Sequence, residues 1–159
     1  MKDISLQIDY TVYHGLEELP AADRKLAEAA IQAQQTSYAP YSKFHVGAAI
    51  RMAGGTIVKG SNQENAASPS GLCAERTALF AASAAYPGVA MEAIAITGGY
   101  GHDSAPRPCT PCGACRQVMA EYQMLGGRPM EVLLVGKEEI WKFKQVDDIL
   151  PFIFDSLEG

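Results

Sequence analysis

The sequence contains little that suits a membrane protein or a secreted protein. Its longest apolar stretches, such as residues 132–135, are far shorter than the roughly 20 residues of a membrane-spanning helix. Residues 1–10 alternate apolar with polar or charged side chains and lack the apolar core of a secretory signal peptide. These absences favour a cytoplasmic protein that makes no contact with a membrane.

Clusters of basic residues are also missing. Lys and Arg number 13 against 18 Asp and Glu, the net charge is −5, and Arg24 and Lys25 form the only adjacent basic pair. Proteins that follow a phosphate backbone usually carry a basic stripe. The sequence therefore argues against nucleic acid as a partner or as a substrate.

Neither repeats nor low-complexity linkers divide the chain, so residues 1–159 are expected to form a single domain. Hydrophobic residues make up 48% and charged residues 19%, which is typical of a globular protein. Periodicity and turn residues predict helices over 20–37, 73–85 and 112–126, and strands over 4–12, 44–52, 56–60, 92–98, 131–136 and 141–146. This alternation predicts an α/β fold in three α/β/α layers, with helices on both faces of a mixed central sheet.

The cysteines predict a metal site. They are Cys73, Cys109, Cys112 and Cys115, and three of them fall within seven residues, which suits metal binding better than disulfides. Cys112 and Cys115 are three positions apart at the start of a predicted helix, so both thiols can reach one ion. Cys73 starts another predicted helix and is the third candidate ligand. Three protein ligands leave one tetrahedral position for water, which is the arrangement of a catalytic zinc.

Charged residues next to these cysteines complete the predicted chemistry. Glu75 follows Cys73 by two positions, where its carboxylate can take a proton from water and pass it to a substrate nitrogen. Three thiolates give a zinc site excess negative charge, and a neighbouring guanidinium can offset it by donating hydrogen bonds to sulfur. Arg76 is the first candidate for this role, and Arg116 is a second.

These elements resemble the zinc-dependent deaminases, which pair a ligand-x-Glu element with Pro-Cys-x-x-Cys. Here the elements read Cys73-Ala74-Glu75 and Pro111-Cys112-Gly113-Ala114-Cys115. The wider similarity, from residues 38–44 to 149–151, is to the small cytidine deaminase family. It implies a cytidine-deaminase-like fold with one Zn²⁺ per subunit. It also implies a homotetramer with shared active sites that deaminates cytidine and 2′-deoxycytidine to uridine and 2′-deoxyuridine, releasing ammonia for pyrimidine salvage.

The resemblance also assigns residues to the substrate. Those residues are Phe44 against the base, Asn62 and Glu64 at the ribose hydroxyls, the backbone of Ala74 at the base edge, and Phe154 at a neighbouring subunit's site. In this family the arginine after the catalytic glutamate contacts the ligand thiolates, which supports Arg76. A carboxylate accepts strong hydrogen bonds from sugar hydroxyls and repels phosphate, so Glu64 favours a free nucleoside as the substrate.

Two segments depart from the family pattern. Where the family commonly has Asn-Ala-Ser-Tyr-Gly-Leu, residues 65–72 lack the aromatic and contain Pro69, and residues 99–108 form a fuller loop that includes His102. Such changes leave open an aminohydrolase that acts on another modified nucleoside or heterocycle. They also leave open whether His102 reaches the pocket or lies in solvent. The non-catalytic alternative is a structural metal module with four cysteine ligands, in which Cys109 binds the metal as well.

Overall fold

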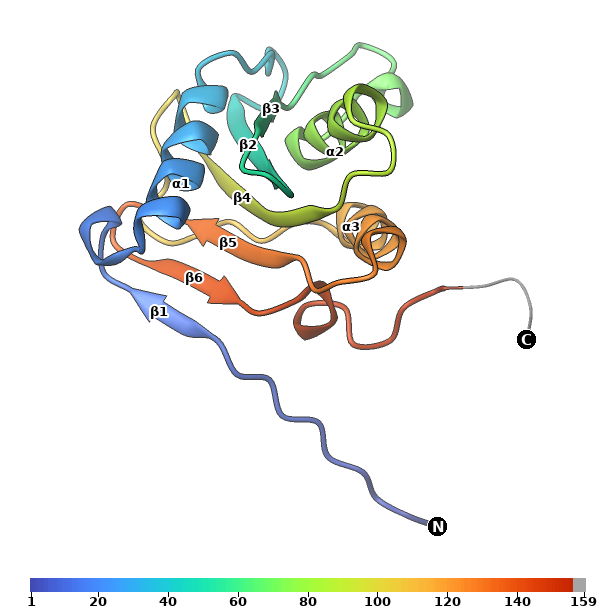
Figure 1. Ribbon diagram of the computed structural model, residues 1–159. Coiled ribbons are helices and arrows are strands. Elements are labelled where there is room, and N and C mark those ends of the chain that lie inside the picture. Colours follow the sequence, from blue (N-terminus) through green and yellow to red (C-terminus); the bar gives the residue numbers. More distant parts are fainter. Residues whose placement is uncertain (156–159) are drawn as a thin grey trace.

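A computed structural model describes residues 1–155 and contains a six-stranded mixed sheet with the strand order β1-β6-β5-β4-β2-β3 (Figure 1). The strands are β1 Thr11–Tyr13, β2 Phe44–Met52, β3 Ile57–Ser61, β4 Met91–Tyr100, β5 Glu131–Val135 and β6 Ile140–Phe143. The α-helices of the described residues are α1 Ala21–Gln34, α2 Ala74–Ala85 and α3 Gly113–Gly126. β4 and β5 run parallel, and the other neighbouring strands run antiparallel, which confirms the predicted mixed sheet.

The helices cover both faces of this sheet, as predicted: α1 lies on one face, and α2 and α3 lie on the other (Figure 1). Alternate residues of β2 pack against the helices on opposite faces of the sheet, because successive side chains of a strand point to opposite faces. Ala49 packs with Leu26 of α1, whereas Ile50 packs with Leu79 of α2. α1 approaches β2 so closely that a Cβ on Gly47 would lie 2.1 Å from the carbonyl oxygen of Ala30. Glycine is therefore required at this contact.

The prediction of a strand over residues 4–12 is wrong for most of its length, because β1 covers only Thr11–Tyr13. β1 pairs with β6, and β6 ends at Phe143 before the chain turns into a 3-10 helix at Val146–Asp148. Residues 4–10 do alternate in polarity, but within residues 1–155 no strand lies beside them.

Among the described residues, no helix is both long enough and apolar enough to cross a bilayer.

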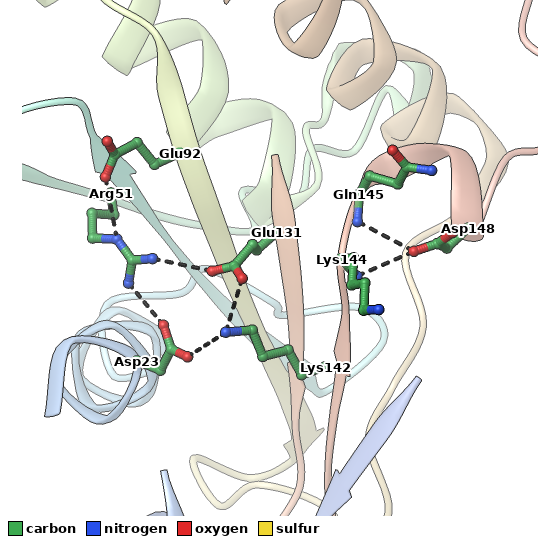
Figure 2. A network of polar contacts seen from close by, with 8 residues as sticks. All are labelled: Asp23, Arg51, Glu92, Glu131, Lys142, Lys144, Gln145 and Asp148. Atoms are coloured by element: carbon green, nitrogen blue, oxygen red, sulfur yellow. Dashed lines mark hydrogen bonds and ion pairs between the residues drawn. The ribbon is translucent and has the colours of Figure 1, made fainter. Parts of the chain in front are cut away.

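A network of buried charges fastens the first turn of α1 to the sheet (Figure 2). The Asp23 carboxylate is only 3% exposed and accepts hydrogen bonds from Arg51 Nη1 at 2.9 Å and Lys142 Nζ at 2.7 Å. Glu131 lies on the far side of both cations, 3.3 Å from Arg51 and 2.9 Å from Lys142. Lys142 thus bridges two carboxylates, and Arg51 bridges three, because its Nε also lies 3.7 Å from Glu92. The network ties α1 to β2, β4, β5 and β6.

Asp23→Asn is expected to destabilise the protein by about 3 kcal/mol, the lower end for breaking a buried ion pair, because both cations keep Glu131. Burial raises the pKa of Asp23, but the hydrogen bonds from Lys142 and Arg51 outweigh it and hold the pKa below its usual value. A lowered pKa adds stability above the unfolded-state pKa, and this is lost as the pH falls through the folded-state pKa.

The measurement is urea unfolding of wild type and Asp23→Asn at pH 7 and well below pH 4, because the folded-state pKa of Asp23 lies below the unfolded-state value of about 3.9. The difference between the two proteins should shrink at the acidic pH. Glu28→Gln, an exposed carboxylate on the same helix, is the matched control and should leave stability unchanged. A difference of equal size at both pH values would show that the Asp23 charge is unimportant.

Candidate metal centre and active site

The N-termini of α2 and α3 bring together the three predicted metal ligands. Cys73 is the residue before α2, Cys112 is the residue before α3, and Cys115 lies in the first turn of α3. Their Sγ atoms all lie within 4.8 Å of one another, and the Sγ atoms of Cys112 and Cys115 are 3.5 Å apart. The positive ends of two helix dipoles therefore converge on three thiols, which favours the thiolate form.

This donor set fits a zinc ion. Sulfur ligands at the usual Zn–S distance of 2.3 Å in a tetrahedral site lie about 3.8 Å apart, within the spread of the three Sγ atoms. Thiolates select zinc over magnesium or calcium, which prefer oxygen ligands. Three protein ligands are one fewer than a closed structural zinc site requires, so this set leaves a coordination position open for chemistry.

The electrostatics of the cluster favour negative charge at Cys73. A hydrogen bond from Cys115 and the nearby Arg76 guanidinium lower the pKa of Cys73 to about 5, despite its partial burial. The pKa of Cys115 is raised, because it hydrogen-bonds to the charged Cys73 and is itself buried. Binding of a metal by Cys115 as a thiolate therefore requires its proton to leave.

Glu75 lies in the first turn of α2, directly behind this cluster, and is 5% exposed. Burial raises the pKa of its carboxyl group, and the negative charge of Cys73 raises it further. A carboxyl group with a raised pKa holds a proton more readily, which suits a group that must both accept and return one in general acid–base catalysis. Its environment therefore suits the proton-transfer role expected from the sequence.

The two candidate arginines have different partners. Arg76 Nη2 donates to Cys73 Sγ at 3.6 Å, and its buried Nε has no hydrogen-bond partner among the described residues. Within the described residues, Arg116 makes no hydrogen bond to the thiols. It donates to the carbonyl oxygens of Pro111 at 2.8 Å and Ile149 at 2.7 Å. Arg76 is thus the cation beside sulfur, and Arg116 fastens the segment before Cys112 to the C-terminal segment.

A cavity of about 450 Å³ adjoins the thiol cluster, a volume in the range of small-molecule pockets. Its walls include Asn62, Glu64, Cys73 and Arg76, so it joins the predicted ribose-binding pair to the metal cluster. Asn62 is held in place because its Oδ1 accepts from Val46 N at 2.8 Å and its Nδ2 donates to the Phe44 carbonyl oxygen at 2.9 Å.

The Glu64 carboxylate is fixed at the rim of this cavity by a turn at residues 40–42. It accepts hydrogen bonds from the backbone N–H of Tyr41 at 2.8 Å and of Ser42 at 3.2 Å. Hydrogen bonding from Ser42 and from Tyr41 lowers the pKa of Glu64, so the group is ionised at neutral pH. Tyr41 and Ser42 also line the cavity, which the sequence analysis missed. The Ala39-Pro40-Tyr41-Ser42 turn was the signal that could have identified them.

The other predicted substrate residues do not line this cavity within the described chain. The Phe44 ring packs edge-on against Tyr100, with ring centroids 5.2 Å apart, at the start of β2. Ala74 is fully buried at the start of α2. Phe154 follows the 3-10 helix at Val146–Asp148 and lies near α3. Its side chain is 65% exposed, and its carbonyl oxygen accepts from Gln117 Nε2 at 2.7 Å.

Cys109 lies apart from the thiol cluster. A Cβ on Gly98 would be 2.8 Å from Cys109 Sγ and 3.0 Å from the Phe44 ring, so these three residues pack together. Burial raises the pKa of Cys109 to about 11, and the charge of Glu75 contributes. The group of Sγ atoms that lie within 4.8 Å of one another contains Cys73, Cys112 and Cys115 but not Cys109, which argues against the four-cysteine alternative. The His102 ring packs at a tilt against the His45 ring, with ring centroids 4.1 Å apart. Among the described residues, His102 is not part of the cavity wall.

Known proteins resemble both the sequence and the fold. Residues 20–125 match the family described as the cytidine and deoxycytidylate deaminase zinc-binding region. A cytidine deaminase of Halalkalibacterium halodurans is 48% identical over 98 residues, which cover 60% of this chain and 68% of that protein. A probable cytidine deaminase of Dictyostelium discoideum is 39% identical over 133 residues, 83% of each chain. The crystal structure of cytidine deaminase from Burkholderia pseudomallei superposes with a TM-score of 0.67 at 44% identity, covering 82% of this chain and 97% of that one.

Proposed function

The chain belongs to the family of zinc-binding cytidine and deoxycytidylate deaminases, and we propose that it hydrolyses cytidine and 2′-deoxycytidine to uridine and 2′-deoxyuridine with release of ammonia. One observation carries this proposal: three thiols that fit a zinc ion lie beside a buried carboxyl group and a nucleoside-sized cavity. The reaction would convert preformed cytosine nucleosides into uracil nucleosides, as in pyrimidine salvage.

Cys73, Cys112 and Cys115 would hold the zinc ion as thiolates. When bound, zinc supplies a Lewis acid that lowers the pKa of water to about 7 and so provides a nucleophile at neutral pH. Glu75 takes a proton from the attacking water and gives it to N3 of the pyrimidine, which makes C4 electrophilic. The water oxygen then bonds to C4. Glu75 moves the second proton to the amino group, the C4–N4 bond breaks, and ammonia leaves.

Arg76 keeps this chemistry favourable at a site with three thiolates. Excess negative charge weakens the activation of water, and a guanidinium that donates to Cys73 Sγ offsets part of it. The buried Nε of Arg76 has no hydrogen-bond partner among the described residues and is a further donor in the same guanidinium. Arg76 is therefore proposed to stabilise the loaded metal site without contacting the substrate.

Asn62 and Glu64 are proposed to bind the ribose hydroxyls from the cavity wall. Their side chains are already fixed by backbone hydrogen bonds, so little conformational entropy is lost when the sugar binds. The ionised Glu64 would repel a phosphate on the sugar, which favours nucleosides over nucleotides. Phe44 would pack against the base, and the backbone of Ala74 would meet the base edge.

Phe154 is proposed to close the active site of a neighbouring subunit in a homotetramer. Because its side chain is exposed, Phe154→Ala is expected to leave the fold of its own subunit intact. We expect this variant to raise KM for cytidine at least about tenfold, the effect of losing one buried aromatic contact. Phe152→Ala, in the same segment and 88% exposed, is the matched control. An unchanged KM in an intact tetramer would exclude this role.

The proposed function is tested by following absorbance near 280 nm while zinc-loaded protein is mixed with cytidine and then with 2′-deoxycytidine. Loss of the cytosine chromophore with release of equimolar ammonia is the expected result. No turnover would overturn the assignment of these substrates. It would favour a related aminohydrolase for a modified nucleoside, because Ser68 of the divergent 65–72 segment lines the cavity. A panel of substituted cytosine nucleosides then identifies the substrate.

A further inference from the structure

Residues 1–10, named here the N-terminal arm, extend away from the domain as a single strand of chain (Figure 1). Apart from Met1, its apolar side chains occupy even positions and are exposed: Ile4 is 82%, Leu6 63% and Ile8 42% exposed. Residues two apart in an extended chain lie on the same side, so these side chains form one apolar face. An exposed apolar face on an extended segment is typical of a strand that pairs with another chain.

The C-terminal end of the arm packs against the domain, but the arm has no strand partner in the described chain. Tyr10 stacks on Phe143, with ring centroids 5.1 Å apart, next to the pairing of Thr11 with Lys142. β6 ends at Phe143, so residues 1–10 extend beyond the strand that pairs with β1. β1 is also the last strand at its end of the sheet, so its outer edge is free within the described residues.

An open cavity of about 440 Å³ lies at the root of the arm, on its apolar side. Its apolar walls come from the arm, the sheet and the C-terminal segment: Ile8, Tyr10, Leu134, Phe143, Ile149 and Pro151. The apolar face of the arm therefore continues into an uncovered apolar hollow of the domain. A partner strand beside the arm would cover both surfaces at once.

We propose that the N-terminal arm pairs antiparallel with the arm of a second copy of this chain, about a twofold axis. The partner must supply an unpaired strand with one apolar face, and the same segment of a second copy has both properties. The free outer edge of β1 would join the new strand pair, so that one sheet continues through both copies.

The pattern of side chains selects the register. In an antiparallel pair, the numbers of two directly opposed residues always add up to the same sum, and this sum defines the register. Directly opposed residues lie on the same face, so the even-numbered apolar residues face one another only when the sum is even. A sum of 12 places Asp3 opposite Asp9, and like charges directly opposite are destabilising. A sum of 16 matches every even apolar residue from 4 to 12: Ile4 with Val12, Leu6 with Tyr10, and Ile8 with Ile8. In this register the partner's Leu6 lies beside Tyr10, at the mouth of the cavity.

Cysteine cross-linking tests the register. Ile8→Cys places two thiols opposite each other across the axis and should give a covalent dimer on mild oxidation. Gln7→Cys, one residue away on the other face, should cross-link at least about tenfold more slowly, because diagonal positions are roughly 7–8 Å apart. The wild-type chain controls for its own cysteines. Equal cross-linking of wild type, Gln7→Cys and Ile8→Cys would overturn the register.

Sedimentation equilibrium tests the interface itself. The double variant Ile4→Ser/Leu6→Ser removes four apolar side chains from the paired arms and should weaken association of the two copies at least about 100-fold. Ser5→Ala/Gln7→Ala, on the polar face, is the matched control and should keep the wild-type mass. Equal masses for all three proteins over the whole concentration range would overturn the proposal. The readout is mass rather than turnover, so it stands apart from the proposed deaminase activity.

Discussion

Glu75→Gln is expected to lower kcat for cytidine by at least about 10²–10⁴-fold, the usual contribution of a general acid–base group. The amide has nearly the same shape as the carboxyl group but can neither take the proton from water nor return it to the ring and the amino group. Glu75 is buried behind the thiol cluster, and burial raises its pKa. No bulk water is therefore positioned to replace it.

The measurement is kcat at saturating cytidine, with zinc content determined on the same samples. The variant should retain its zinc, because Glu75 is not one of the three thiol donors. Removing a buried charge also leaves the fold intact or more stable, so the thermal midpoint should not fall. Glu121→Gln, an exposed carboxylate on α3, is the control. Near-normal turnover by zinc-loaded Glu75→Gln would exclude Glu75 as the proton carrier.

Local patterns predicted the thiol cluster because they act over short distances. Cys112 and Cys115 are on one face of a helix start, and Cys73 stands at the start of the next element in the motif. The local patterns did not predict that the N-termini of α2 and α3 lie together, but the resemblance to the deaminases implied it. The structure brings the three Sγ atoms within 4.8 Å, which is the geometry this expectation required.

Other features could not be predicted because they depend on contacts between distant parts of the chain. Asp23 and Lys142 are 119 positions apart, and nothing local to either residue indicates that they form an ion pair. The arm was predicted as a strand because its alternation is that of a strand, whereas pairing depends on the length of β6. Every residue except proline has a backbone N–H, so residue type does not show that the N–H of Tyr41 binds the Glu64 carboxylate.

The position of Cys109 explains why four cysteines do not make a four-ligand site. Its Sγ packs against Gly98 and the Phe44 ring, on the strand side of the site, rather than with the other three sulfurs. Sequence spacing placed Cys109 as close to Cys112 as Cys115 is, and only the structure separates them.

Replacing Cys73 by Ala is therefore expected to remove zinc and abolish turnover, whereas Cys109→Ser is expected to retain both. Two remaining thiolates hold zinc far more weakly than three, because each lost ligand removes a bond that the open site cannot replace. Cys109→Ser changes a neutral thiol outside the cluster and leaves the three donors in place. The two variants thus compare a cysteine inside the predicted ligand set with one outside it.

Zinc per subunit is measured after dialysis against a weak chelator, and thiolate coordination is followed by absorbance after substitution with Co²⁺. Wild type and Cys109→Ser should retain about one metal ion and the same thiolate-to-cobalt band, whereas Cys73→Ala should lose both. Tetrahedral cobalt with three sulfur ligands differs in spectrum from cobalt with four, so the band also counts the ligands. Loss of metal from Cys109→Ser would instead establish a four-cysteine site. Such a site has no position open for water, and the catalytic role of the metal would have to be abandoned.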